Sequence, residues 1–356
     1  MAGEGIHMVA GPGEDGMTAR GALRRANGVS QRLIRKIIHG EGEGAGALYI
    51  NGAPALFKDR VKAGDEIRLV FPAEETWIEP EDIPLSVLYE DDDILIADKP
   101  PGLVVHPTKG HRSGTLANAI VGHMQKRGES YRPRFISRLD MDTSGVLLIG
   151  KNSHAQNSLT RQNEAGRVEK IYTAVLDGRL EDQLPREGVI DLPIGLAQPG
   201  EPKRAVLHEA DGGSPARTAY EVVEWRAGAS QPLASTGLEQ KAATAGGPAA
   251  TAGKPAATAG LQAVAAGKPA ATAGKPSSES LTVVRVWLIT GRTHQIRVHF
   301  SHFSCPVLGD SLYGHPSPLI ARQALHAAEI AFTHPSSGLE LRTTAPLPAD
   351  IATALG

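Results

Sequence analysis

The stretch Arg138-Leu139-Asp140-Met141-Asp142-Thr143-Ser144-Gly145 is followed at once by the apolar run Val146-Leu147-Leu148-Ile149. A polar turn that leads into a buried strand can present a side chain at the floor of a cleft. Asp140 stands beside the base Arg138 on this turn, and a carboxylate held in this way can act as a nucleophile. The stretch therefore predicts a catalytic acid at position 140.

The whole chain has 356 residues, a formal net charge of -2 and 4% aromatic residues. This length is sufficient for two domains. Cys305 is the single cysteine, which excludes an internal disulfide and a cysteine-built metal site and fits a reducing compartment. The first residues lack the apolar core of a signal peptide, and no apolar run approaches the roughly 20 residues of a membrane span. We therefore expect a cytoplasmic protein that does not associate with membranes.

Changes in composition along the chain predict its domains. Residues 1–18 are rich in glycine and acids and predict a disordered tail. Residues 19–71 predict a small module with a helix after Ser30 and a strand that closes on the turn Asn51-Gly52. Residues 72–85 form an acidic, proline-containing linker, and residues 86–349 form the main domain.

The small module is the basic part of the chain. Residues 20–70 hold ten Lys or Arg against five Asp or Glu, a net charge of +5, so the rest carries -7. The predicted helix buries Leu33, Ile34, Ile37 and Ile38 and leaves its bases outside, namely Arg32, Arg35 and Lys36. Such a module predicts RNA binding through phosphates without sequence reading. Its layout resembles the S-four-like RNA-binding domain, named after the small-subunit ribosomal protein.

The main domain shows the alternating pattern of strands. Residues 94–107 predict a strand, a turn at Pro100-Pro101-Gly102 and a second strand. Residues 170–176, 218–225 and 281–289 alternate as well. These patterns predict an α+β protein, in which the main domain has a mostly antiparallel sheet with a central cleft.

Residues 228–280 have a composition that cannot form a core. They repeat Ala-Ala-Thr-Ala-Gly-(Gly/Lys)-Pro and hold no aromatic residue. Such a segment cannot offset its ordering entropy. If the flanking strands pair as a hairpin, this is a low-complexity insertion at a loop tip. An inert expansion is the simpler interpretation, and an added RNA contact through Lys254, Lys268 and Lys275 is the alternative.

Four motifs in this order resemble the RluA family of pseudouridine synthases. They are Arg138-Leu139-Asp140 with Asp142-Thr143-Ser144-Gly145, Lys170-Ile171-Tyr172, Gly291-Arg292-Thr293-His294-Gln295-Ile296-Arg297, and Leu325-His326-Ala327 with His334-Pro335. The resemblance implies isomerisation of specific uridines in ribosomal or transfer RNA, with no cofactor and no metal. This chain has Ser137 where the family commonly has histidine, which affects a supporting contact and not the nucleophile.

The resemblance also implies roles for individual residues. Asp140 is the nucleophile, and Arg297 is the cation expected to keep it ionised against desolvation. Tyr172 lies against the target base and can help to remove the C5 proton. Arg138 fills the space left by a flipped uridine, and the loop with Arg292 and His294 contacts RNA. We expect His294 to be a structural hydrogen-bonding residue rather than a catalytic base.

Two other functions fit parts of the pattern. A retaining nucleosidase would pair Asp140 with a second acid such as Asp142, although Asp142 is explained more simply by holding the turn. A non-catalytic protein that binds structured RNA is the other alternative. His299 and His302 are three residues apart, but without further ligands they do not indicate zinc. The sequence leaves open which RNA and uridine are the target, the chemical route, the oligomeric state and protein partners.

Overall fold

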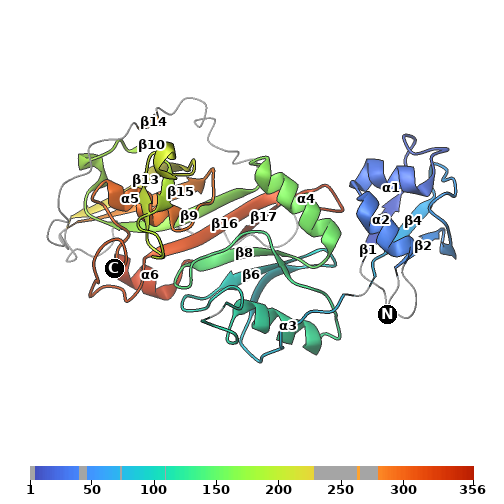
Figure 1. The fold of residues 1–356 in the computed structure, drawn as a ribbon, viewed down its shortest axis with the longest axis horizontal. Helices are drawn as coiled ribbons and strands as arrows, with labels where there is room; N and C mark the ends of the chain where they lie inside the picture. Colours follow the sequence, from blue (N-terminus) through green and yellow to red (C-terminus); the bar gives the residue numbers. More distant parts are fainter. Residues whose placement is uncertain (1–4, 40–45, 73, 109, 228–262, 265–279) are drawn as a thin grey trace. The chain divides into compact units, whose positions relative to one another are not determined.

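The computed structural model describes residues 5–39, 46–72, 74–108, 110–227, 263–264 and 280–356 (Figure 1). The chain divides into two compact units. Unit 1 comprises Met1–Met141, Gly145–Val168 and Glu329–Ala345, and unit 2 comprises Asp142–Ser144, Glu169–Ala328 and Pro346–Gly356. Both units combine helices with mostly antiparallel strands, so the predicted α+β class is confirmed. No helix in the described ranges is long and apolar enough to cross a membrane.

Unit 1 begins with a four-stranded antiparallel sheet of order β1-β4-β2-β3 that carries two helices. The elements are β1 (Gly5–Val9), α1 (Ala19–Asn27), α2 (Gln31–Ile38), β2 (Ala47–Ile50), β3 (Ala53–Pro54) and β4 (Glu66–Val70). The predicted helix cap is confirmed, because the Ser30 hydroxyl accepts from the Leu33 amide at 3.1 Å. Asn51 and Gly52 have φ of 49° and 76°, the conformation that the predicted tight turn between β2 and β3 requires.

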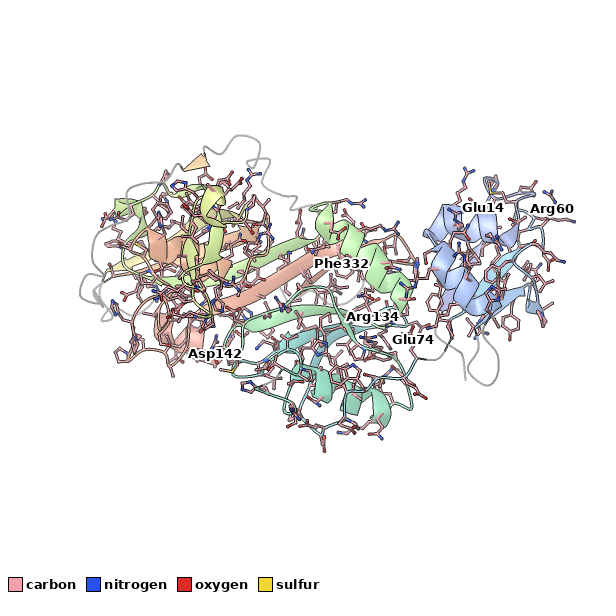
Figure 2. All side chains as sticks on the ribbon, viewed as in Figure 1. Glu14, Arg60, Glu74, Arg134, Asp142 and Phe332 are labelled. Carbon is pink, nitrogen blue, oxygen red and sulfur yellow. The ribbon has the colours of Figure 1, made fainter. Side chains whose placement is uncertain are left out.

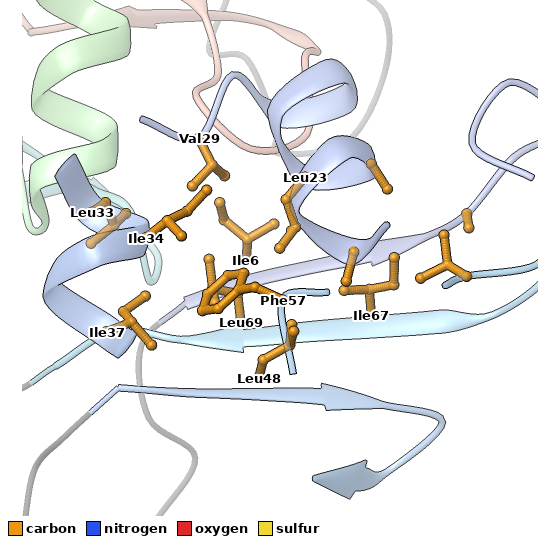
Figure 3. Packing of buried hydrophobic residues seen from close by; sticks show 14 residues of the cluster. Ile6, Leu23, Val29, Leu33, Ile34, Ile37, Leu48, Phe57, Ile67 and Leu69 are labelled. Carbon is orange, nitrogen blue, oxygen red and sulfur yellow. The ribbon is translucent and has the colours of Figure 1, made fainter. Parts of the chain in front are cut away.

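The core of this part lies between the two helices and the sheet (Figure 3). Leu33, Ile34 and Ile37 point into it, as predicted, together with Ile6 and Leu69. The expected burial of Ile38 was wrong: its side chain is 46% exposed, because Ile38 is the last residue of α2, beyond the stripe that faces the core.

The disordered tail expected over residues 1–18 was wrong for the residues that the structure describes. Gly5–Val9 form β1, which pairs antiparallel with β4, and Ile6 is fully buried. A Cβ on Gly5 would lie 1.8 Å from the carbonyl oxygen of Leu69, so this close approach of two strands requires glycine. The local composition could not reveal this strand, because its partner strand lies some 60 residues further along the chain.

The described residues of the predicted linker, 72 and 74–85, contain no helix or strand but are held to the protein. Ile78 is buried, and the carbonyl of Glu79 accepts from the Asn118 side chain at 2.8 Å. Asn118 belongs to α3 (Leu116–Lys126). The Glu81 carboxylate accepts from the Gly114 amide just before this helix, at 2.9 Å. The segment therefore packs onto α3, while its domain boundaries stay predictions.

The rest of unit 1 is built on strands in the order β8-β6-β5. The elements are β5 (Ser86–Glu90), β6 (Ile94–Lys99), β7 (Arg134–Phe135), β8 (Ser144–Gly150), α4 (Ser153–Glu164) and β17 (Glu340–Thr344). β7 pairs with β8, and β17 pairs with the last five residues of β16 (Leu325–Thr333). The core joins Ile96 and Leu148 from the sheet to Leu159 from α4 and Phe332 from β16.

The second strand expected at residues 103–107 was wrong. Only a single bridge forms there, between Val104 and Thr115. The carbonyls of Val104 and Val105 instead accept from the amides of Leu116 and Ala117, the first residues of α3. Amides at the start of a helix have no partner inside that helix, so these two amides bind the carbonyls of residues 104 and 105. Those carbonyls are then not available for pairing as a strand.

Unit 2 contains strands in the order β14-β10-β13-β15-β9 and a separate hairpin, β11-β12. Its elements are β9 (Glu169–Asp177), β10 (Glu187–Asp191), β11 (Ile194–Leu196), β12 (Arg204–Val206), β13 (Arg217–Ala227), β14 (Ala263–Val264), β15 (Ser280–Leu288), α5 (Gln295–His302), α6 (Ala349–Leu355) and the 3-10 helices Leu180–Asp182 and Glu209–Asp211. The long strands β9, β13 and β15 confirm the three predicted alternating segments.

The insertion joins two strands that pair as a hairpin, which is the condition under which the sequence placed it at a loop tip. β13 and β15 are antiparallel, and their register ends at Ala227 opposite Ser280. Within the insertion, β14 pairs in parallel with β10, which the sequence did not predict. The repeats and the three lysines at 254, 268 and 275 lie outside the described residues.

Candidate active site

The turn that carries Asp140 links β7 to β8. Asp140 is half-buried, between exposed Arg138 and exposed Met141, and the intervening Leu139 is buried. The predicted strand after the turn is confirmed, because all seven residues of β8 are buried. The chain passes from unit 1 to unit 2 after Met141 and returns to unit 1 at Gly145. Asp140 therefore lies at the end of unit 1, next to a fully buried strand.

Lys99, the last residue of β6, holds the turn on its unit 1 side. Its side chain is fully buried, and its ammonium donates to the carbonyls of Pro100 at 2.8 Å, Leu103 at 2.8 Å and Met141 at 2.7 Å. A buried ammonium needs such partners, because removing its charge from water is costly. Lys99 thus fixes the peptide group between Met141 and Asp142, one residue after Asp140. The sequence analysis missed it, although a lysine that ends an apolar strand was a visible signal.

In unit 2, Arg322 holds the next part of the turn, from Asp142 to Ser144. Its guanidinium donates to the Asp142 carbonyl at 2.9 Å and forms a bidentate ion pair with Asp350, at 2.6 and 2.9 Å. The Ser144 hydroxyl is 3.0 Å from Nδ1 of His326, which belongs to the predicted Leu325-His326-Ala327 motif. The sequence analysis did not identify Arg322, whose partners in the turn are about 180 residues away along the chain.

The role expected for Asp142 was wrong. We expected its side chain to hold the turn, but its carboxylate makes no hydrogen bond to the described residues. The Asp142 backbone carbonyl meets Arg322, and Gln323 donates to the Thr143 hydroxyl at 3.4 Å. The turn is therefore fixed by side chains from outside it.

Arg297 lies on α5 in unit 2 and is buried. Its Nε and Nη2 donate to the two carboxylate oxygens of Asp310, at 2.6 and 2.9 Å. Asp310 is fully buried, and its Oδ1 also accepts from the amides of Leu312 and Tyr313. The guanidinium carbon is 5.1 Å from the centre of the Tyr313 ring. This bidentate pair fixes the plane of the guanidinium. No pattern in the sequence indicated the pair.

Tyr172 lies on β9 in unit 2, opposite Val286 of β15, and is buried. The strand predicted to carry it is confirmed. Lys170 precedes it by two residues on the same face of the strand, and burial lowers the pKa of its ammonium. Tyr172 and Arg297 belong to unit 2 and Asp140 to unit 1, so their joint action is a proposal.

The loop before α5 is held by Gln295. Its side-chain oxygen accepts from the Arg292 amide and the Thr290 hydroxyl, and its nitrogen donates to Thr218. Arg292 is exposed, as an RNA-contacting side chain must be. His294 adopts φ of 59° at the helix cap, and its Nδ1 is 2.8 Å from the Tyr313 hydroxyl. This bond supports the structural role expected for His294.

His299 is a buried structural histidine. One ring nitrogen is 2.8 Å from the Thr218 hydroxyl, and the other is 2.9 Å from the Leu192 carbonyl. Burial lowers its pKa to about 4, so it is neutral at physiological pH. With both nitrogens engaged, His299 is not a metal ligand.

The basic face predicted for the N-terminal part is present on α2. Arg32, Arg35 and Lys36 are exposed, as expected. The Lys36 ammonium is 2.8 Å from the Glu74 carboxylate. Among the described residues, Lys36 is the one base of this helix face that forms an ion pair, so the helix offers a cationic surface that is partly neutralised at that position.

Comparison with known proteins gives the family. Residues 93–302 match the model of a family described as RNA pseudouridylate synthase. The chain is 32% identical over 327 residues to the uncharacterized RNA pseudouridine synthase YjbO of Bacillus subtilis, covering 91% of this chain and 94% of that protein. It is 33% identical over 317 residues to the ribosomal large subunit pseudouridine synthase D of Nitrosomonas europaea, covering 86% of this chain and 75% of that protein.

A solved structure shares the fold. It is the human RNA pseudouridylate synthase domain containing 4, with a TM-score of 0.50 and 19% sequence identity over 76% of this chain and 91% of that chain. Together with the family match and the identities above, the resemblance to the RluA family is confirmed. The chain belongs to the RNA pseudouridine synthase family, and it is an isomerase that acts on RNA.

Proposed function

We propose that this enzyme converts specific uridines of ribosomal RNA to pseudouridine, with Asp140 as the residue that takes the ribose. Support for a ribosomal substrate comes from relatives named as ribosomal large subunit pseudouridine synthase D, in Nitrosomonas europaea and in Neisseria meningitidis, at 33% and 34% identity. Transfer RNA is the other substrate class that the sequence allowed. A cytoplasmic location fits either substrate and stays a prediction.

The reaction needs no atoms from outside the substrate. The bond from ribose C1′ to N1 of uracil breaks, the ring turns, and C5 bonds to C1′. The proton on C5 leaves, and N1 takes up a proton, so the product is an isomer of the uridine. While the base is detached, a carboxylate either adds to C1′ or removes the neighbouring C2′ proton, and the two routes remain alternatives.

The observation that carries the assignment of Asp140 is the rigid turn around it. Lys99 holds the carbonyl of Met141 in unit 1, and Arg322 holds the carbonyl of Asp142 in unit 2. A nucleophile gains its effect from a fixed near-attack geometry, and a displacement of about 1 Å can cost about 100-fold in rate. Two buried cations on consecutive peptide groups give Asp140 such a fixed backbone.

Arg297 is proposed to keep Asp140 ionised, and Tyr172 to lie against the uracil. Both assignments rest on the family motifs that these residues occupy. Asp310 takes two of the five N–H donors of Arg297, so this pair does not exclude a second carboxylate partner. Arg138 is exposed next to the turn, where a planar cation can enter the base stack of the RNA.

The N-terminal part is proposed to be an S-four-like RNA-binding module. Arg32 and Arg35 are exposed on α2, which places two cations on one short helix. The loop side chains Arg292 and His294 are proposed to contact RNA in unit 2. These contacts bind phosphate and therefore position the substrate without reading its sequence.

The test is incubation with RNA tritiated at uridine C5. Release of tritium to water without free uracil is expected, because the glycosidic bond is remade through carbon. Ribosomal RNA should release tritium and transfer RNA should not, after which the modified position can be mapped. Release from transfer RNA alone would contradict the substrate, and free uracil would indicate a nucleosidase.

A further inference from the structure

A large groove in unit 1 is strongly cationic. It has a volume of about 1200 Å³, above the roughly 300–1000 Å³ of most small-molecule sites. Its lining comes from α1 and α2, from the segment that follows β4, and from residues 105–161. Seven Lys or Arg side chains line it against one acid, Glu74.

The single acid of the groove is already neutralised. Glu74 accepts from Lys36 at 2.8 Å and forms an ion pair with Arg134, which lies beside it (Figure 2). These bonds lower the pKa of Glu74 in spite of burial, which alone would raise it. Five guanidinium groups remain that make no ion pair with the described residues, and all five are exposed: Arg24, Arg32, Arg132, Arg138 and Arg161.

An exposed aromatic face lies in the same groove. Trp77 is 66% exposed, and its indole is stacked on the His106 ring at 6.3 Å between centroids and 6° between planes. His106 in turn contacts Phe135, at 5.2 Å and 55°. The buried neighbour Ile78 anchors the backbone of Trp77. The indole is thus supported on one side and open on the other.

His106 supports the indole as a neutral ring. Its Nδ1 is buried and has no hydrogen-bond partner among the described residues. Burial lowers the pKa of His106, and the charge of Arg132 lowers it further. A neutral histidine stacks on the indole without adding to the positive charge, so Trp77 offers a flat apolar platform among guanidiniums that form no ion pair with the described residues.

We infer that this groove binds a single-stranded segment of the RNA substrate, with one base stacked on Trp77 and phosphates held by the five arginines. Single-stranded RNA needs this combination of an aromatic face and a cationic channel. Arg138 lines the groove and is two residues before Asp140 in the chain, so the bound segment adjoins the uridine that reacts. The inference rests on the proposed function and specifies where the flanking nucleotides lie.

Binding of an oligouridylate of about 12 nucleotides to the full chain tests the stacking platform. Trp77→Ala should weaken affinity by about 5- to 150-fold, the range measured for loss of one base–aromatic stack. Trp77→Phe should retain affinity within about threefold, because it keeps an aromatic face. Trp225→Ala is the matched control, since Trp225 is 39% exposed, lies in unit 2 and should leave affinity unchanged.

The cationic part is tested by salt dependence. Arg24→Gln with Arg132→Gln should flatten the slope of log affinity against log salt by about 0.7 per lost phosphate contact. Unchanged affinity in Trp77→Ala together with an unchanged slope would overturn the inference and point to another partner for the groove, such as an acidic peptide. The proposed function is judged separately: tritium release by these same variants shows that it stands even if the groove does not bind RNA.

Discussion

Replacing Lys99 with methionine tests whether the three hydrogen bonds of its ammonium, called the clamp here, hold the turn that carries Asp140. Methionine has a similar length and no hydrogen-bond donor, so it fills most of the same space. The carbonyls of Pro100, Leu103 and Met141 would each lose a charge-assisted hydrogen bond. The Met141 carbonyl would then be free to shift, and Asp140 would shift with it.

Two opposing terms set the loss of stability. Hydrogen bonds to a charged group contribute about 1.5–3 kcal/mol each, and three are lost. Burying the ammonium costs several kcal/mol, and that cost disappears in the variant. We expect a net decrease of about 2–4 kcal/mol in the free energy of unfolding. A displacement of Asp140 by about 1 Å should lower kcat by about 100-fold, with little change in KM.

The assay is steady-state tritium release, with urea unfolding of the same samples. Lys151→Met is the matched control, because Lys151 is also buried and pairs with Glu90 at 3.2 Å and Glu129 at 2.8 Å instead of with the turn. It should lose stability and keep kcat. If Lys99→Met retains kcat within about threefold of the control, the clamp does not position Asp140.

Three further predictions concern stability and RNA binding. The Asp91 carboxylate is 2.9 Å from the His334 ring and accepts from Tyr89 at 2.7 Å. Burial alone would raise the pKa of Asp91, but these hydrogen bonds outweigh burial and lower the pKa to about 2. Burial alone would lower the pKa of His334, but its bond to Asp91 outweighs burial and raises the pKa above its ordinary value of 6.5. The contribution of His334 to the free energy of unfolding is therefore complete below pH 6.5 and is lost as the pH rises through its raised pKa. The contribution of Asp91 to the free energy of unfolding is lost as the pH falls from 3.8 towards about 2. Urea unfolding across this range should show both losses, and Asp91→Asn should remove them; an Asp91→Asn profile identical to wild type would contradict the pairing. Removing residues 1–71 should weaken RNA binding most at low salt and flatten its salt dependence, because the exposed bases of α2 are lost, and an unchanged slope in a titration at several salt concentrations would refute this. Replacing residues 228–279 with a short glycine-containing turn should leave the fold intact, since β13 and β15 already meet at Ala227 and Ser280 and, of the residues that the structure describes, the change removes only the two of β14; a large drop in Tm would show that the insertion is structural.

Local patterns predicted the parts of the fold that depend on neighbouring residues. The cap at Ser30, the turn at Asn51-Gly52 and the buried strand after Gly145 are all set within a few positions of the chain, and all were confirmed. The strands β13 and β15 on either side of the insertion were also predicted from their alternation, whereas their pairing was only a condition that the structure meets.

Features that depend on distant partners could not be predicted in this way. β1 forms because it pairs antiparallel with β4, which begins at Glu66, and because Ile6 is buried in the core; composition alone indicated a tail. Asp310 matters through its bidentate pair with Arg297, and Arg322 through its hydrogen bond to the Asp142 carbonyl. No periodicity in the sequence reveals either contact. Trp77 lies in a segment whose acids and prolines indicated a linker, so its stack on His106 was visible only in the structure.

The role of Asp140 is tested most directly by single-turnover tritium release in Asp140→Asn, measured beside RNA affinity. Asparagine keeps the shape and removes the charge, so turnover should fall below detection while affinity for RNA stays nearly unchanged. Asp92→Asn is the control, because Asp92 is an exposed acid of the same unit and should keep full activity. Tritium release by Asp140→Asn at a rate near that of wild type would contradict the account.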